Sequence, residues 1–314
     1  MFNAVATAWR ARGGVVLAPR AATVEELAAV HDRDHIERIA GTAGRAAMLD
    51  PDTFTSPESY ELACLAAGAA IVGVDYAMAG SGPALVLVRP PGHHAERDKA
   101  MGFCLFNNAA VAAAYARAHG ARRVAVVDVD VHHGNGTQAI FEDDPDVLYV
   151  STHQYPCYPG TGAVTEAGTG AGRGRTVNVP IEPGAGDDDY AHVLRTVVVP
   201  VLHAFAADLV IASVGFDAHA SDPLAQMQVT DDGYRSMLAT LWAAAAEASN
   251  GRFVVLAEGG YDLAALAAGL ESTVEVLDAP PAMPLPASPS GPGIRGREAA
   301  QAALSVQKPF WPAL

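Results

Sequence analysis

Short runs of aliphatic, often β-branched residues recur along the chain and alternate with longer alanine-rich stretches. Each run is apolar on both faces, which is typical of parallel strands that helices cover on two sides. We therefore predict strands in these runs. The predicted strands are 84–88, 124–127, 147–150, 176–181, 209–214 and 253–256.

The stretches between these runs predict helices. Ser56-Pro57 marks the start of one helix, because proline is tolerated in the first helical turn. The predicted helices are 56–79, 107–119, 188–206, 231–249, 263–276 and 297–306. Strands that alternate with helices predict an α/β fold, here a single domain whose mostly parallel sheet is sandwiched by helices.

The pattern changes near the C-terminus, where residues 279–296 are rich in proline, glycine and serine. We predict a catalytic domain over 1–278, a linker over 279–296, and a C-terminal helix and tail over 297–314 that packs on the domain. The aromatic residues of the tail support that packing, because exposed aromatic surface is unfavourable.

Composition narrows the class of protein. Of 314 residues, 50% are hydrophobic and 18% are charged, which excludes a disordered chain and indicates a large buried core. The 35 acidic and 20 basic residues give a net charge of -15, which argues against direct nucleic-acid binding and favours a cationic substrate. Three cysteines without a close pair, no leader and no uninterrupted apolar span predict a reduced, cytoplasmic protein that does not cross a membrane.

Polar clusters follow five of the predicted strands directly. Because ligands bind beyond the carboxyl ends of parallel strands, these clusters predict an active site at one edge of the sheet. The clusters are 89–94, 128–136, 151–153, 215–217 and 258–261.

Asp130, His132 and Asp217 are candidate metal ligands. Residues i and i+2 leaving a strand point the same way, so Asp130 and His132 can share one ion, with Asp217 arriving from another strand end. Three protein ligands leave positions for water and substrate, the pattern of a catalytic site, and two carboxylates favour hydrolysis without redox chemistry. Taken alone, the Asp-Val-Asp-Val-His run could equally cap a strand and form salt bridges.

His93 and His94 are candidate proton-transfer residues. Hydrolysis at a metal needs a base for the water and an acid for the leaving amine, and histidine can serve as both near neutral pH. Asp128 is the expected carboxylate partner of the pair. Tyr261, after two glycines, offers a phenol O–H to an oxyanion. Isolated residues of these types more often have a structural role, so it is their combination that favours catalysis.

Together these residues resemble the arginase-fold histone deacetylase family, which includes bacterial deacetylase-like amidohydrolases and acetylpolyamine amidohydrolases. The resemblance runs from about residue 22 to the C-terminus, and Asn135 and Glu258 resemble its class II branch. Its motifs are Arg89-Pro-Pro-Gly-His-His-Ala95, Gly102-Phe-Cys-Leu-Phe-Asn-Asn108, Asp128-Val-Asp-Val-His-His-Gly-Asn-Gly-Thr-Gln138, Gly215-Phe-Asp-Ala218 and Glu258-Gly-Gly-Tyr261.

The resemblance implies a role for each matching residue. Asp130, His132 and Asp217 match the ligands of one Zn²⁺, and His94 matches the general base and acid. The other catalytic positions are His93 with Asp128, Asn135 beside His94, and Tyr261 at the carbonyl. The substrate-binding positions are Phe103, Tyr158, Gly102, Leu224 and Gly260. A structural monovalent-cation site, expected to hold K⁺, matches Asp128, Asp130, His132, Ser151 and Thr152.

The chain departs from the family pattern in two informative ways. The usual N-terminal strand and loop are expected to be lacking, because residues 2–12 already match the helix that follows them. Asn135 stands where class I relatives have an aspartate, and an uncharged amide raises an imidazole pKa less than a carboxylate does. His94 is therefore expected to be neutral more readily.

The leading interpretation is zinc-dependent hydrolysis of N-acetyl amides on lysine side chains of proteins or peptides. An acetylpolyamine amidohydrolase is the first alternative, although Leu224 stands where polyamine-selective relatives have glutamate. An arginase-type ureohydrolase is disfavoured, because the carboxylate cluster that holds two Mn²⁺ is not found. A non-catalytic acyl-lysine scaffold is the alternative from another class. The chain could also form an oligomer.

Overall fold

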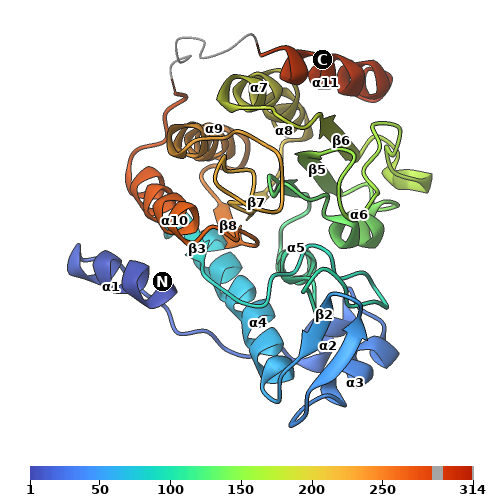
Figure 1. Ribbon diagram of the computed structural model, residues 1–314, viewed down its shortest axis with the longest axis vertical. Coiled ribbons are helices and arrows are strands. Elements are labelled where there is room, and N and C mark those ends of the chain that lie inside the picture. Colours follow the sequence, from blue (N-terminus) through green and yellow to red (C-terminus); the bar gives the residue numbers. More distant parts are fainter. Residues whose placement is uncertain (285–292, 313–314) are drawn as a thin grey trace.

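A six-stranded parallel sheet lies at the centre of the computed structural model, which describes residues 1–284 and 293–312 (Figure 1). Its strand order is β3-β8-β7-β4-β5-β6. The strands are β3 (Ala84–Val86), β4 (Val124–Asp128), β5 (Val147–Gln154), β6 (Thr176–Ile181), β7 (Leu209–Val214) and β8 (Phe253–Ala257). The predicted α/β class, with a mostly parallel sheet, is confirmed.

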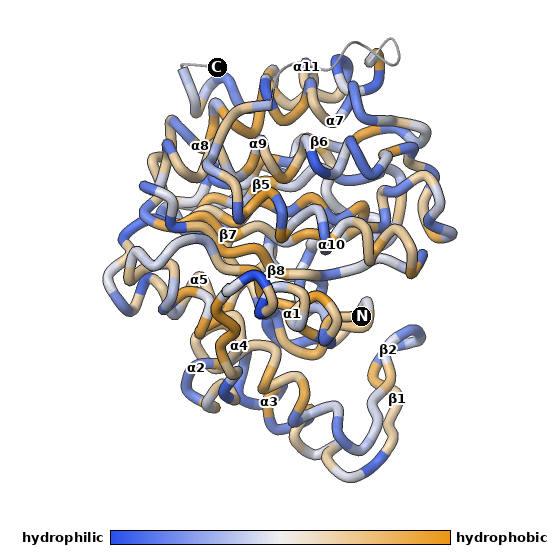
Figure 2. The backbone as a smooth tube through the Cα atoms, turned by 90° about the vertical axis from the view of Figure 1, so that its left-hand side faces the viewer, coloured by the Kyte–Doolittle hydropathy of each residue, from blue (hydrophilic) through white to orange (hydrophobic). Residues whose placement is uncertain are grey.

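Helices cover both faces of this sheet, and the alternation of side chains along each strand divides the core in two. In β4, Ala125 and Val127 belong to one hydrophobic cluster, whereas Val124 and Val126 belong to the other. The first cluster lies under α7 (Asp187–Val193), α8 (Val199–Phe205), α9 (Asp231–Ser249), α10 (Leu263–Asp278) and α11 (Ile294–Gln307). The second lies under α4 (Ser59–Met78), α5 (Asn108–Ala118) and α6 (Asn135–Phe141). Hydrophobic residues are concentrated along the central strands (Figure 2).

Two predicted helices differ from the structure in detail. The helix predicted over 188–206 consists of α7 and α8 joined by a π-helical segment, Leu194–Val198. Pro200 follows this segment at the start of α8; proline has no N–H to donate, and the wider turn accommodates it. The helix predicted from 56 begins instead at Ser59, because Ser56 donates its backbone N–H to the Ser59 hydroxyl and stays in a turn.

The segment before α4 contains elements that the hydrophobic pattern does not predict. They are α1 (Phe2–Ala11), which the resemblance alone indicates, and α2 (Val24–Ala28), α3 (Arg33–Ala40), β1 (Ala47–Asp50) and β2 (Thr53–Thr55). The β1–β2 hairpin contacts the loop that follows β3, because Asp52 and Thr53 accept the backbone N–H groups of Gly102 and Phe103. This hairpin thus supports one side of the strand ends.

Helix α11 and the tail pack on the side of the sheet that ends in β6. Gln307 donates to the carbonyl of Thr176, and the buried Trp311 donates to that of Gly174. Of the expected linker, residues 285–292 lie outside the described residues, as do 313–314 of the tail. The expected domain boundaries stay predictions.

Among the described helices, α4 alone is long and apolar enough to cross a membrane. This is weak evidence for a span, because 56% of its apolar window is buried inside the protein. The helix contacts α5, β3 and β8, as a core helix does.

Candidate active site

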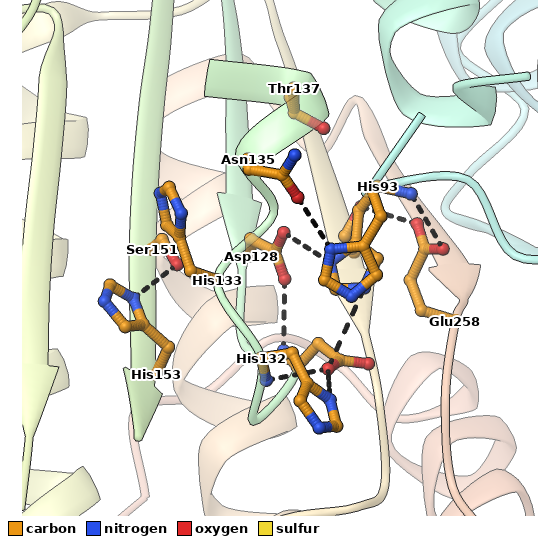
Figure 3. Close-up of polar contacts among 12 residues, drawn as sticks. His93, Asp128, His132, His133, Asn135, Thr137, Ser151, His153 and Glu258 are labelled. Atoms are coloured by element: carbon orange, nitrogen blue, oxygen red, sulfur yellow. Dashed lines mark hydrogen bonds and ion pairs between the residues drawn. The ribbon is translucent and has the colours of Figure 1, made fainter. Parts of the chain in front are cut away.

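The polar clusters meet at the carboxyl ends of the strands (Figure 3). His93 and His94 lie on the loop after β3, and Asp130 and His132 lie on the loop after β4, which ends in Asp128. The expectation that residues 151–153 follow a strand is wrong, because they lie inside β5. Their polar groups are accommodated there by local bonding, such as the 2.9 Å contact between Ser151 Oγ and His153 Nδ1.

Asp130, His132 and Asp217 form one compact cluster. The Nδ1 atom of His132 lies 3.1 Å from Asp130 Oδ1 and 3.1 Å from Asp217 Oδ2. One ligand atom from each residue can be chosen so that all lie within 4.8 Å of one another, and all three residues are buried. Gly215 is needed beside them, because a Cβ there would lie 1.9 Å from Asp130 Oδ2.

The electrostatics of this cluster favour a bound cation. Burial and the neighbouring Asp130 raise the pKa of Asp217 to about 6. The two carboxylates raise the pKa of His132 to about 11 despite its burial, so a proton is held where their charges converge. Two buried carboxylates and an imidazole are a donor set that suits Zn²⁺, whose binding would release this proton. The residues therefore fit the expected metal.

His93 forms a buried ion pair with Asp128. Its Nδ1 lies 3.0 Å from Asp128 Oδ2, and the same oxygen accepts the Tyr149 hydroxyl at 3.3 Å. Although burial opposes it, the negative charges of Asp128 and Asp130 raise the pKa of His93 to about 10. His93 is therefore a cation at neutral pH.

His94 is neutral by contrast. Its Nδ1 lies 2.8 Å from the side-chain oxygen of Asn135, and its Nε2 has no hydrogen-bond partner among the residues that the structure describes. Burial and the cationic His93, whose ring centre is 4.0 Å away, lower the pKa of His94 well below its usual value. A neutral imidazole beside a cationic one separates a proton acceptor from a fixed positive charge.

Aromatic side chains flank the site. The Tyr158 ring packs edge-on against His94 at 5.1 Å and His132 at 6.2 Å, and the Phe103 ring lies 6.1 Å from Tyr261. Glycine at position 102 lets the backbone lie close to the His94 ring, because it has φ +57° and a Cβ there would lie 2.4 Å from that ring.

The comparisons with known proteins agree with this geometry. The family model for the histone deacetylase domain matches residues 2–277. The chain belongs to the histone deacetylase family.

Several relatives of this family resemble the chain closely. It is 46% identical to the histone deacetylase-like amidohydrolase of Pseudomonas aeruginosa, over 76% of this chain and 64% of that protein. It is 42% identical to histone deacetylase 15 of Arabidopsis thaliana (94% and 54%) and 39% identical to the human polyamine deacetylase HDAC10 (95% and 46%). The crystal structure of the HDA15 HD domain matches with a TM-score of 0.90 at 39% identity, over 99% of this chain and 87% of that one. The chain spans about half to two thirds of the length of the first curated relatives that it matches.

In this deacetylase-family site, Tyr261 is held by Asp222. The buried Asp222 accepts the backbone N–H groups of Tyr261 at 2.8 Å and Leu224 at 3.0 Å through its two oxygens. Leu224, which is 52% exposed, is thus tied to the loop that carries Tyr261. Gly260 has φ +131°, in the region that favours glycine, and a Cβ there would lie 3.3 Å from the Cβ of Phe216.

Two residues of the expected monovalent-cation site are neighbours in the sheet. Asp128 and Ser151 are register neighbours in the paired strands β4 and β5, and Asp128 accepts the backbone N–H of Asp130. The Thr152 hydroxyl has no hydrogen-bond partner among the described residues, and as the next residue along the strand it faces away from Ser151. K⁺ binding stays a prediction.

Sequence reasoning also misses the supporting roles of Tyr149, Asp52 and Glu258. Tyr149 donates to Asp128, and Asp52 supports Gly102. Glu258, which the sequence places in the polar cluster 258–261 and in a family motif, is buried and accepts the backbone N–H of Gly92 at 2.7 Å and the Ser213 hydroxyl at 2.9 Å. Burial raises the pKa of Glu258 to about 7, although the nearby His93 opposes this. Its position directly after a buried strand marks Glu258 as a candidate in the sequence but does not report these contacts.

Proposed function

We propose that this chain hydrolyses N-acetyl amides of lysine side chains in proteins or peptides, with zinc as its metal. The observation that carries the proposal is the juxtaposition of the Asp130–His132–Asp217 cluster with a neutral His94 and a cationic His93. Such a set combines a metal site with separate groups for proton transfer and charge stabilisation.

The residues divide the work of amide hydrolysis. Zinc held by Asp130, His132 and Asp217 would polarise the acyl carbonyl and activate a water molecule. His94 accepts the proton of the attacking water at Nε2 and returns it to the nitrogen of the departing amine. Tyr261 donates its hydroxyl to the carbonyl oxygen as that atom gains negative charge, and His93 adds a fixed positive charge nearby.

The surroundings favour an apolar stem that ends in an amide. Phe103 and Tyr158 flank the site with half-exposed rings, and both can pack against the methylene chain of an acyl-lysine. The net charge of -15 adds long-range attraction for cationic peptides, screened by salt. K⁺ beside Asp128 and Ser151 is part of the same proposal.

The decisive experiment combines metal analysis with turnover. We expect the purified protein to hold one zinc per chain and to release acetate from a fluorogenic acetyl-lysine peptide, and we expect a chelator to abolish turnover until zinc is restored. Zinc without turnover of any acetylated amine would favour the non-catalytic scaffold.

Tyr261→Phe tests the oxyanion role. The variant keeps the ring and removes only the O–H donor, so kcat should fall by about 10² or more while KM changes little. Steady-state kinetics on the acetyl-lysine peptide measure both constants, and Phe103→Leu is the control for general disturbance of the aromatic wall. An unchanged kcat with a raised KM would make Tyr261 a substrate-positioning residue instead.

Leu224→Glu tests the choice between lysine and polyamine substrates, which the likeness to a polyamine deacetylase keeps open. A polyamine carries a second ammonium group. Leu224 is apolar and 52% exposed, so it cannot compensate that charge, whereas a carboxylate at the same position would form an ion pair with it. We expect the wild type to prefer acetyl-lysine peptides over acetylated putrescine or spermidine, and the variant to shift kcat/KM toward the polyamines.

The measurement is the kcat/KM ratio for both substrate classes, in both proteins, at fixed ionic strength. Leu224→Gln is the matched control, because it adds polarity without charge. A wild type that already prefers acetylpolyamines would support the alternative function.

A further inference from the structure

The Asn135 side chain is buried between two different kinds of neighbour. Its oxygen faces His94 Nδ1 at 2.8 Å, and its nitrogen faces Glu96 Oε1 at 2.6 Å and Met101 Sδ at 3.4 Å. Glu96 lies two residues after His94 and is half-buried. The side chains of Glu96, Asn135 and His94 form a chain of hydrogen bonds from a carboxylate to the imidazole.

The chemistry of these neighbours fixes the direction of every hydrogen bond. A carboxylate and a thioether accept hydrogen bonds and do not donate them, so the NH₂ group of Asn135 must face Glu96 and Met101. The amide oxygen must then face His94, and because that oxygen only accepts, His94 Nδ1 must carry the hydrogen. The lone pair of the neutral ring is thereby placed on Nε2.

Glu96 is itself held in place by the backbone around it. Its carbonyl oxygen accepts a hydrogen bond from His31 Nδ1 at 2.9 Å, and its N–H donates to the Lys99 carbonyl. The direction at His31 is also fixed, because its Nε2 accepts the backbone N–H of Asn107. Burial lowers the pKa of His31 to about 3, so this ring is neutral and keeps one tautomer.

We propose that Glu96 is a positioning residue for the reaction: through Asn135 it holds His94 in the Nδ1–H tautomer, with Nε2 free to take a proton. The inference rests on the proposed role of His94 as the base. Glu96 does not touch the reacting atoms. In other sites a carboxylate accepts a hydrogen bond from the histidine ring directly. Here the carboxylate of Glu96 acts through the Asn135 amide, so the His94 ring is oriented without a charged group in contact with it.

Two substitutions separate the acceptor from its charge. Glu96→Leu removes the acceptor and leaves Met101 alone to orient the amide, so kcat should fall by about tenfold or more with KM nearly unchanged. Glu96→Gln offers either a carbonyl or an NH₂ group, so a fraction of molecules can carry Asn135 flipped, and kcat should fall by less. Glu26→Gln, at the N-terminal cap of α2, is the matched control and should leave kcat unchanged.

A double-mutant cycle with Asn135→Asp gives the sharpest outcome. The introduced aspartate would place a carboxylate directly on His94 but also against Glu96, where two like charges would be in contact. Glu96→Gln should therefore raise kcat in the Asn135→Asp background, although it lowers kcat in the wild type. If Glu96 only stabilises its loop, Glu96→Gln should lower kcat in both backgrounds, and its effect on kcat would not change sign.

The tautomer can be observed without turnover. Long-range ¹H–¹⁵N spectra of protein labelled at histidine, with the His94 signals assigned from a His94→Gln variant, should show Nδ1–H in the wild type and a mixture in Glu96→Leu. Wild-type kcat in Glu96→Leu, an unchanged tautomer, or effects of equal sign in the cycle would each overturn the inference. An inactive wild type with the Nδ1–H tautomer would instead contradict the proposed function and leave the orientation by Glu96 in place.

Discussion

Asp217→Ala is expected to abolish zinc binding and amide hydrolysis together. The variant removes one of the two carboxylates within 3.1 Å of His132 Nδ1, and the remaining aspartate and histidine cannot hold the ion in a three-ligand site. Turnover should fall to the level of the zinc-free wild type. Elemental analysis after dialysis, together with the acetyl-lysine assay, measures both losses.

Asp217 is needed to hold zinc, but in the zinc-free protein it is expected to lower folding stability. The pKa of Asp217 is raised from 3.8 to about 6, so the folded state prefers the protonated form. A raised carboxyl pKa means that stability falls as pH rises from about 4 to about 6 and stays lower above that range. Asp217→Asn removes this penalty, so the zinc-free variant should unfold at a higher temperature than the zinc-free wild type at pH 7.

Thermal unfolding with and without zinc distinguishes a lost ligand from a damaged fold. Zinc should raise the melting temperature of the wild type and leave that of Asp217→Asn unchanged. Asp189→Asn is the matched control, because Asp189 is also buried but caps α7 by accepting the N–H of Gly186 and is not one of the three clustered ligands. This control should lose stability and keep its zinc. Full zinc content in either Asp217 variant would show that the ligand assignment is wrong.

The fold is predictable from the sequence where strands are buried on both faces. All five residues of β4 are buried, and the first four, residues 124–127, form a continuous apolar run without a competing helical pattern. The segment over residues 22–55 is not predictable in this way, because α2 has five residues and β2 has three, too short for a periodic signal. The polarity of residues 151–154 argues against a strand there, but buried partners such as His153 satisfy Ser151 within β5.

The candidate site is predictable where neighbours in sequence are neighbours in space. Asp130 and His132 can be paired from their spacing, and Asp217 from its place after another strand. The supporting residues cannot be found in this way, since their roles come from long-range contacts. Glu258 holds the backbone of Gly92, 166 residues away, and no local pattern reports that contact. The role of Glu96 cannot be found from the sequence, because the sequence indicates only that its partner Asn135 replaces an aspartate and does not show that the two side chains are in contact.

Substitutions of the two adjacent histidines are also expected to have large effects. The His94 variant should lose more activity, and the His93 variant should lose more stability. His94→Ala removes the neutral ring whose Nε2 is free, so kcat should fall by about 10² to 10⁴ while the fold loses little. His93→Ala leaves Asp128 buried without its cationic partner, and breaking such a pair costs about 3–5 kcal/mol of unfolding free energy. Its activity should also fall, but by less than that of His94→Ala.

The pH dependence of stability tests the His93 assignment with an explicit sign. Because the pKa of His93 is raised from 6.5 to about 10 in the folded state, its contribution is fully present below about pH 6.5 and is lost as pH rises toward 10. The stability difference between wild type and His93→Gln should therefore shrink across that range, whereas that between wild type and His94→Gln should not. Denaturant unfolding at several pH values, beside steady-state kinetics, measures both rankings. Equal kcat for His94→Ala and wild type would exclude His94 as the base. A His93 variant that is as stable as the wild type at pH 6.5 would show that another group compensates the charge of Asp128.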